Sequence, residues 1–174
     1  MIYRSESFKQ TKNFALEMAK EILLRREIVG PTTPTSVGLR RRVPAEASGK
    51  TKFRVKDAVI LALKGNLGSG KTTFTQGFLK GLGIRKKITS PTFVIQKNYR
   101  LRTTHYRRAY HIDCYRIKKS QELLILGIKE IFDNPKNIIL IEWPEKIKNI
   151  LPKERFNLKF EYGEKENERR IIIG

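Results

Sequence analysis

The sequence predicts an α/β fold, a three-layer sandwich around a central, mostly parallel sheet. Short apolar runs at 59–63 and 138–141 have the length and composition of buried strands. Amphipathic patterns at 5–26 and 73–82 have the spacing of helices. The first buried strand leads directly into a glycine-rich loop and a helix, which is the order of elements in an α/β unit.

Composition limits the class of protein. The chain has 174 residues, enough for one domain (1–174) with a substantial core, and 39% of them are hydrophobic. The formal net charge of +20 exceeds what solubility requires. Such an excess indicates an anionic partner such as RNA, or else a lysine-rich solvated surface.

Cysteine content and apolar runs exclude other classes. Cys114 is the single cysteine, so a disulfide framework and a cysteine metal cage are excluded. Its apolar strand context predicts a buried side chain rather than a nucleophile. No signal-like segment or membrane-length apolar run is present, so we expect a cytoplasmic protein without membrane contact.

The N-terminal third contains a predicted helix and a long connection. The helix covers 5–26, and Ser5 or Ser7 can cap it. Thr11 lies near its start, either as a capping or surface threonine or as a polar group that faces a ligand. Prolines, glycines and arginines fill 29–57, which predicts a basic flexible insertion that either contacts RNA or is only solvated.

Residues Gly65–Thr72 fit the phosphate-binding loop pattern, glycine, four residues, then Gly-Lys-Ser/Thr. Glycines allow consecutive N–H groups to point at phosphate oxygens, and the following helix adds its positive end. Lys71 would reach the β- and γ-phosphates, and the Thr72 hydroxyl would hold Mg²⁺. The pattern predicts binding of a nucleotide phosphate; the alternative is a plain glycine-rich turn.

Residues 89–117 contain a second candidate region. Thr89–Thr92 forms a tight loop that either responds to the γ-phosphate or is a plain turn, and a strand is expected at 93–99. In the strand 110–117, alternation places His111, Asp113 and Tyr115 on one face. Asp113 is therefore a candidate catalytic carboxylate, with a structural hydrogen bond to His111 as the alternative.

The C-terminal third completes the predicted sheet. A helix is expected at 120–132, and the apolar strand Asn137–Glu142 ends in an acid, as a Walker B strand does. Glu142 would meet Mg²⁺, or it merely ends the strand. Trp143 either covers a nucleotide or packs, and the strands at 156–162 and 169–173 predict an edge hairpin.

Several blocks, in order, resemble the TsaE (YjeE) family of small P-loop ATPases required for threonylcarbamoyladenosine in tRNA. They read GNLGSGKTTFTQGFLKGLG, ITSPTF, YHIDCYRI, ELLILGIKEIFD and IEWPE. The resemblance implies a P-loop NTPase-like fold that binds ATP and Mg²⁺, with Thr72 and Glu142 serving the metal. It implies that Asp113, Glu142 and Lys71 are catalytic. The cofactor-binding residues that it implies are Thr11, Asn66, Leu67, Gly68, Ser69, Gly70, Lys71, Thr72, Thr73 and Trp143.

The resemblance also implies partners. Members of the family are weak ATPases alone and act with the TsaD–TsaB heterodimer, so that tRNA is met through the complex. This chain departs from the family at Asn66, where members usually have Asp, and in its long basic connection at 29–57. These departures leave direct contact with tRNA open.

Alternative functions use the same loop. A small-molecule kinase would need an acceptor pocket, and only the arginines within 100–108 resemble a lid. The alternative of a non-enzymatic RNA-binding protein is supported by the positive charge alone. A GTPase is not supported, because the sequence has no Asn-Lys-x-Asp motif to bind the guanine base. We expect attack of water on the γ-phosphate, with Asp113 orienting the water and Glu142 on the metal, although the two carboxylates can exchange these roles.

Overall fold

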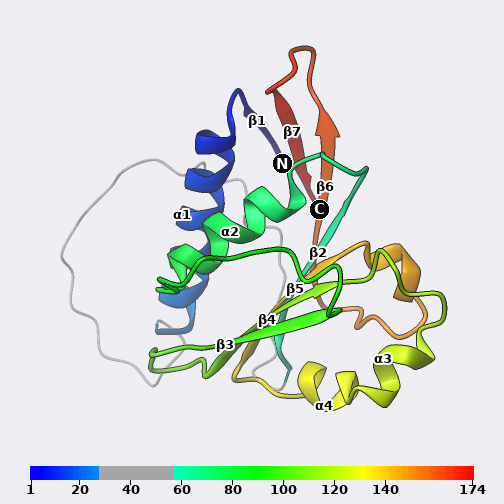
Figure 1. Cartoon of the computed structure of the whole chain (residues 1–174). Helices are drawn as coiled ribbons and strands as arrows, with labels where there is room; N and C mark the ends of the chain where they lie inside the picture. The colour runs from blue at the N-terminus through cyan, green and yellow to red at the C-terminus, as the bar shows by residue number, and fades with distance from the viewer. Residues whose placement is uncertain (28–56) are drawn as a thin grey trace.

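The computed structural model describes residues 1–27 and 57–174. In this part of the chain, strands form a seven-stranded sheet in the order β1-β7-β6-β2-β5-β4-β3 (Figure 1). The strands are β1 Ile2–Ser5, β2 Val59–Gly65, β3 Gln96–Arg100, β4 Arg108–Asp113, β5 Asn137–Glu142, β6 Phe156–Tyr162 and β7 Arg169–Ile173. The helices are α1 Phe8–Glu27, α2 Lys71–Gly81, α3 Gln121–Ile125 and α4 Ile128–Phe132, with the 3-10 helix η2 Pro144–Ile147.

The centre of the sheet is parallel and its flanks are antiparallel. Strands β6, β2, β5 and β4 run in one direction. Strands β7 and β1 on one flank and β3 on the other pair antiparallel with their neighbours. The predicted α/β class is confirmed, with a mixed sheet. Because β2, β5 and β4 are parallel, their carboxyl ends meet at one edge, where ligands bind in open α/β sheets.

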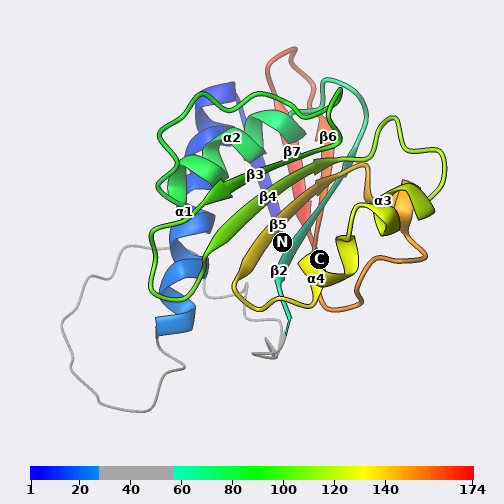
Figure 2. The same ribbon diagram turned by 60° about the horizontal axis from the view of Figure 1, so that its bottom comes forward.

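Helices cover both faces of the sheet, as the three-layer prediction requires (Figures 1 and 2). Helices α1 and α2 lie together on one face, where Leu61 packs with Phe74 and Phe78. On the other face, Ile60 packs with residues of α3 and α4. Neighbouring residues of β2 thus enter opposite cores, as alternation along a strand requires.

The pair α1 and α2 is in close contact because two glycines of α2 face α1. A Cβ at Gly77 would lie 2.2 Å from the carbonyl oxygen of Lys12. A Cβ at Gly81 would lie 2.5 Å from the carbonyl oxygen of Leu16. Both distances are shorter than atoms tolerate, so glycine is what permits the two helix backbones to approach.

The N-terminus differs from the prediction. The strand β1 precedes α1, and it pairs with β7 and forms the edge of the sheet. The β6–β7 hairpin is therefore present but does not lie at the edge. Ser7 rather than Ser5 caps α1, since its Oγ accepts a hydrogen bond from the Gln10 N–H at 3.2 Å. The strand β1 has only four residues and no apolar run, so no sequence pattern predicts it. Only its pairing with β7 identifies it.

Three further boundaries correct the sequence analysis. The strand expected at 93–99 begins only at Gln96, and Phe93 and Val94 are exposed. The helix expected at 120–132 is broken by Gly127, whose φ of 72° favours glycine and ends a helix. Strand β4 ends at Asp113, so Tyr115 lies beyond it.

Other expectations concern single features. Cys114 is buried as predicted, and burial raises the pKa of its thiol to about 12, which removes it as a nucleophile at neutral pH. Among the described residues, no helix is long and apolar enough to cross a membrane. The predicted basic insertion at 29–57 lies outside the described residues, except for Asp57.

Candidate active site

The glycine-rich loop joins β2 to α2. Gly65 has φ of 154°, and a Cβ there would lie 2.5 Å from the carbonyl oxygen of Phe160 in β6. Gly70 precedes α2 with φ of 100°, in the left-handed region. These positions exclude side chains, and the loop can thus turn tightly and present its N–H groups at the start of α2.

The hairpin β6–β7 braces the loop from outside. The Tyr162 hydroxyl donates a hydrogen bond to the carbonyl oxygen of Leu67. The guanidinium of Arg169 is buried and donates to the carbonyl oxygen of Gly68 at 3.3 Å. It also donates to the carbonyl oxygens of Glu166 and Glu168 at 2.6 and 2.7 Å. The loop is thus fixed by a distant part of the chain, a contact that sequence spacing does not reveal.

Lys71 is the first residue of α2 and is buried. Its Nζ donates to the carbonyl oxygens of Gly65 and Asn66 at 2.7 and 2.8 Å. The same atom lies 4.3 Å from the centre of the Trp143 ring, a cation–π distance. Burial lowers the pKa of Lys71, and the carboxylates of Glu142, Asp113 and Glu145 oppose this shift. The amine is therefore enclosed at the mouth of the loop.

Thr72 and Glu142 form a direct contact between α2 and the end of β5. The Thr72 hydroxyl lies 3.1 Å from each carboxylate oxygen of Glu142. The Nε2 of His111, on the neighbouring strand β4, donates to Glu142 Oε1 at 2.8 Å. Both His111 and Glu142 are buried. A hydroxyl and a carboxylate are the hard oxygen donors that Mg²⁺ prefers, so these residues fit that ion.

Asp113 lies at the end of β4, directly beside Glu142 in the register of the sheet. Its Oδ2 accepts hydrogen bonds from the hydroxyls of Thr92 and Ser90, at 2.5 and 3.2 Å. Its Oδ1 accepts from the backbone N–H of Tyr115 at 2.9 Å. The loop predicted as a γ-phosphate sensor or a plain turn is therefore hydrogen-bonded to the candidate catalytic carboxylate.

Trp143 follows Glu142 and adopts φ of 60° and ψ of 50°, in the left-handed region. A bulky residue rarely occupies this region, which costs about 1–3 kcal/mol when the surroundings enforce it. The backbone N–H of Trp143 donates to the carbonyl oxygen of Leu63 at 3.2 Å, and the Trp143 ring packs against Tyr115. This strained backbone directs the indole over Lys71.

These groups line one cleft of about 360 Å³. That volume is in the range of small-ligand sites. Most of the predicted site residues line it, namely Leu67, Gly68, Gly70, Lys71, Thr72, Thr73, Asp113, Glu142 and Trp143. The cleft is thus the place where the loop, the two carboxylates and the tryptophan meet.

Three predicted residues do not line the cleft. Thr11 is buried, with its Oγ1 2.8 Å from the Ser5 Oγ. Asn66 lines a separate groove against β6. Ser69 is buried, and its hydroxyl has no hydrogen-bond partner within the described ranges 1–27 and 57–174. An orphaned hydroxyl inside a phosphate loop is consistent with a ligand that completes it.

The cleft also contains residues that the sequence analysis did not assign. Ser90, Thr92 and Tyr115 line it, and the TSPT loop and the alternation around Asp113 pointed to their neighbourhood. Phe8 lines it from the start of α1 and is half exposed. No local pattern marks Phe8, because only the packing of α1 against α2 brings it to the loop.

The fold and this cleft define the P-loop class of α/β proteins: a buried strand, a glycine loop capping a helix, and an acid at the end of the adjacent parallel strand. The chain belongs to the TsaE family. The family model described as "Threonylcarbamoyl adenosine biosynthesis protein TsaE" matches residues 41–171.

Individual relatives agree with the family model. The chain is 37% identical over 111 residues to the TsaE protein of Haemophilus influenzae, covering 64% of this chain and 68% of that protein. It is 42% identical over 103 residues to TsaE of Bacillus subtilis, covering 59% of this chain and 61% of that protein. Each is named as a tRNA threonylcarbamoyladenosine biosynthesis protein.

A solved structure shows the same fold. The crystal structure of Bacillus subtilis YdiB superposes with a TM-score of 0.64 at 28% sequence identity. The match covers 98% of this chain and 82% of YdiB. The predicted family and fold class are both confirmed.

Proposed function

We propose that the protein binds ATP with Mg²⁺ in the cleft and hydrolyses it, as a cytoplasmic subunit required for threonylcarbamoyladenosine modification of tRNA. In this proposal it acts with the TsaD–TsaB complex to sustain turnover. The observation that carries the proposal is the contact of the Thr72 hydroxyl with both oxygens of Glu142, 3.1 Å away, in front of the glycine loop.

The loop and Lys71 would bind the phosphates. The N–H groups at the start of α2 and the positive end of that helix favour an anion at this position. Lys71 Nζ is already held at the loop by two carbonyl oxygens and the Trp143 ring. An ammonium so placed needs only to turn toward the phosphates, because burial and packing have fixed its stem.

Thr72 and Glu142 would hold Mg²⁺, directly or through water, and the ion would neutralise charge on the phosphates. His111 donates to Glu142 and fixes the orientation of its carboxylate. Such a partner behind a ligand is a common feature of metal sites. The residues of β4, β5 and α2 thus place the acceptor oxygens before any ligand arrives.

Asp113 would orient the attacking water. Its two oxygens already accept hydrogen bonds from Ser90, Thr92 and the Tyr115 N–H, which orient the carboxylate toward the cleft. A carboxylate oriented beside the γ-phosphate position can accept a proton or align a water molecule. The division of roles between Asp113 and Glu142 remains part of the proposal.

The small-molecule kinase is disfavoured by the placement of the candidate lid arginines. Arg100, Arg102, Arg107 and Arg108 lie at or between the ends of β3 and β4. None of them is among the residues that line the cleft in the described structure. A lid over a transferred phosphate would have to face that cleft.

The test is ATP hydrolysis by the purified protein, alone and with TsaD–TsaB and tRNA. We expect weak basal turnover and strong stimulation by the partners, with both lost in Asp113→Ala and Glu142→Ala. A rate of ATP hydrolysis that does not change when TsaD–TsaB and tRNA are added would contradict the proposal. Transfer of phosphate to a small acceptor would contradict it as well. A structure with a nucleotide analogue would assign the two carboxylates.

A further inference from the structure

Another concave surface lies beside the cleft, between the first half of α1, the end of α2 and the segment that follows α2. Its volume is about 1050 Å³. Gly77 lines it, at the point where α1 and α2 come into closest contact. Its basic residues are Lys9, Lys12, Lys80, Arg85, Lys86 and Lys87. We call this surface the basic groove.

The charges of the basic groove are not compensated by the part of the protein that the structure describes. Among the described residues that line it there is no Asp or Glu. All of its basic side chains are exposed, and none forms an ion pair with another residue of the described structure. By contrast, Lys159 and Arg170 on the hairpin β6–β7 both pair with Glu161. Like charges gathered in one groove repel one another, and an anionic occupant removes that cost.

The shape of the surface limits the anion. The charges come from three segments of the chain and surround a groove rather than a flat face. Phe8 is the one exposed large apolar side chain of this groove within the described structure, whereas a membrane-binding surface presents a broad apolar face. A groove lined by lysines tracks a chain of phosphates without reading bases, because each ammonium binds phosphate as a point charge. A polyphosphate backbone therefore fits better than a lipid surface.

We propose that the basic groove binds the phosphodiester backbone of tRNA. The choice of tRNA among polyanions rests on the proposed function. The groove and the ATP cleft share Phe8, so that RNA bound in the groove lies beside the nucleotide site. Direct contact with RNA, left open by the sequence, is thereby assigned to α1, α2 and the segment 83–88.

The test uses the full-length chain and a fluorescently labelled, unmodified tRNA transcript, with binding followed by fluorescence anisotropy across a salt series. The groove variant combines Lys12→Gln, Lys80→Gln and Lys86→Gln. We expect its affinity for tRNA to fall at least about tenfold. The slope of log affinity against log salt should become less steep by roughly 2–3, near one unit for each lost phosphate contact.

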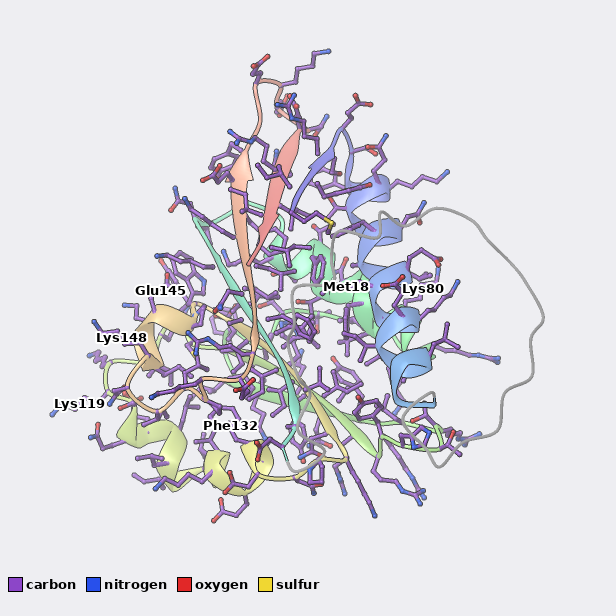
Figure 3. All side chains as sticks on the ribbon, turned by 180° about the vertical axis from the view of Figure 1, so that it is seen from behind. Met18, Lys80, Lys119, Phe132, Glu145 and Lys148 are labelled. Carbon is purple, nitrogen blue, oxygen red and sulfur yellow. The ribbon has the colours of Figure 1, made fainter. Side chains whose placement is uncertain are left out.

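A matched variant removes the same charge elsewhere, through Lys119→Gln, Lys129→Gln and Lys148→Gln. Lys119 and Lys148 lie on the side of the molecule opposite to Lys80 (Figure 3). The three substituted lysines of this variant are all exposed. We expect this variant to bind tRNA like the unmodified chain, with the same salt slope. Equal losses in both variants would overturn the proposal, because they would show a diffuse charge effect.

Two further outcomes would also overturn it. In the first outcome, the protein without substitutions does not bind tRNA. In the second, the groove variant loses binding to phosphatidylglycerol vesicles but keeps its binding to tRNA. ATP binding is measured on the same samples by calorimetry, and the groove variant should retain it. A chain that binds tRNA in the groove but not ATP would refute the proposed function while leaving the groove assignment intact.

Discussion

The two carboxylates of the cleft are neighbours in the sheet but are held in different ways. Glu142 accepts hydrogen bonds from His111 on β4 and Thr72 on α2, both parts of the regular framework. Asp113 accepts its side-chain hydrogen bonds from Ser90 and Thr92, which belong to a loop. Framework contacts are among the last to open, whereas loop contacts open locally at lower free energy. We therefore expect Glu142 to be the more rigid carboxylate, and Asp113 to follow any local opening of its loop.

The largest effect is expected from the framework carboxylate. Glu142→Gln keeps the shape of the side chain but removes the charge that would face Mg²⁺. Hydrolysis with TsaD–TsaB and tRNA should fall by about 10²–10³, the scale of losing one preorganised electrostatic group. Steady-state phosphate release measures it, and a thermal melt checks the fold. If Asp113→Asn showed this loss while Glu142→Gln changed turnover only a few-fold, the assigned roles would be exchanged.

Lys71→Ala tests the phosphate contact on the same framework. ATP affinity should weaken by about 1.5–3 kcal/mol, or roughly 10–150-fold, the value of a charge-assisted contact. Isothermal titration calorimetry measures it. Lys64→Ala, at an exposed position near the base of the loop, is the control and should bind ATP normally. Unchanged affinity in Lys71→Ala would remove this residue from the site.

His111→Leu removes the donor that orients Glu142 without touching the cleft lining. The Mg²⁺ concentration for half-maximal ATP binding should rise by about tenfold, since partners behind a metal ligand commonly contribute that much. His111→Gln, which retains an N–H donor, should restore part of the loss. A purely structural role for His111 would lower the melting temperature and leave the Mg²⁺ requirement unchanged.

The smallest effect is expected on the loop side. Thr92→Val removes one hydrogen bond to Asp113 but leaves those from Ser90 and the Tyr115 N–H. We therefore expect a net loss of about 1 kcal/mol, less than the ~1.5–3 kcal/mol of a fully lost bond to a charged group. Turnover should fall about fivefold while ATP affinity stays the same. Thr89→Val, in the same loop but bonded to Lys97 instead, serves as the control. A loss of ATP affinity rather than turnover would show that Thr92 binds nucleotide instead of supporting Asp113.

The sequence correctly predicted the part of the site that regular elements form, namely the end of β2, the start of α2 and the end of β5. The apolar run, the glycine loop and the acid at the end of β5 are local patterns, and each appears where it was expected. The loop side was located less well. Strand β3 begins later than predicted because the chain turns at Ile95, which has φ of 61°. Thr92, just before this turn, bonds to Asp113 at the end of the neighbouring strand β4, and no local propensity encodes that contact.

The sequence by itself determined the class of fold, the family, the glycine-rich loop and the two acidic strand ends, because these depend on residues close together in the chain. Only the tertiary structure decided which carboxylate is held by His111 and which by the loop, that β1 covers the hairpin edge, and that Thr11 faces Ser5. It also assembled the basic groove from α1, α2 and the segment after α2. Except for Thr11 with Ser5, such contacts join residues far apart in the chain, and the energies of all of them depend on packing rather than on local pattern.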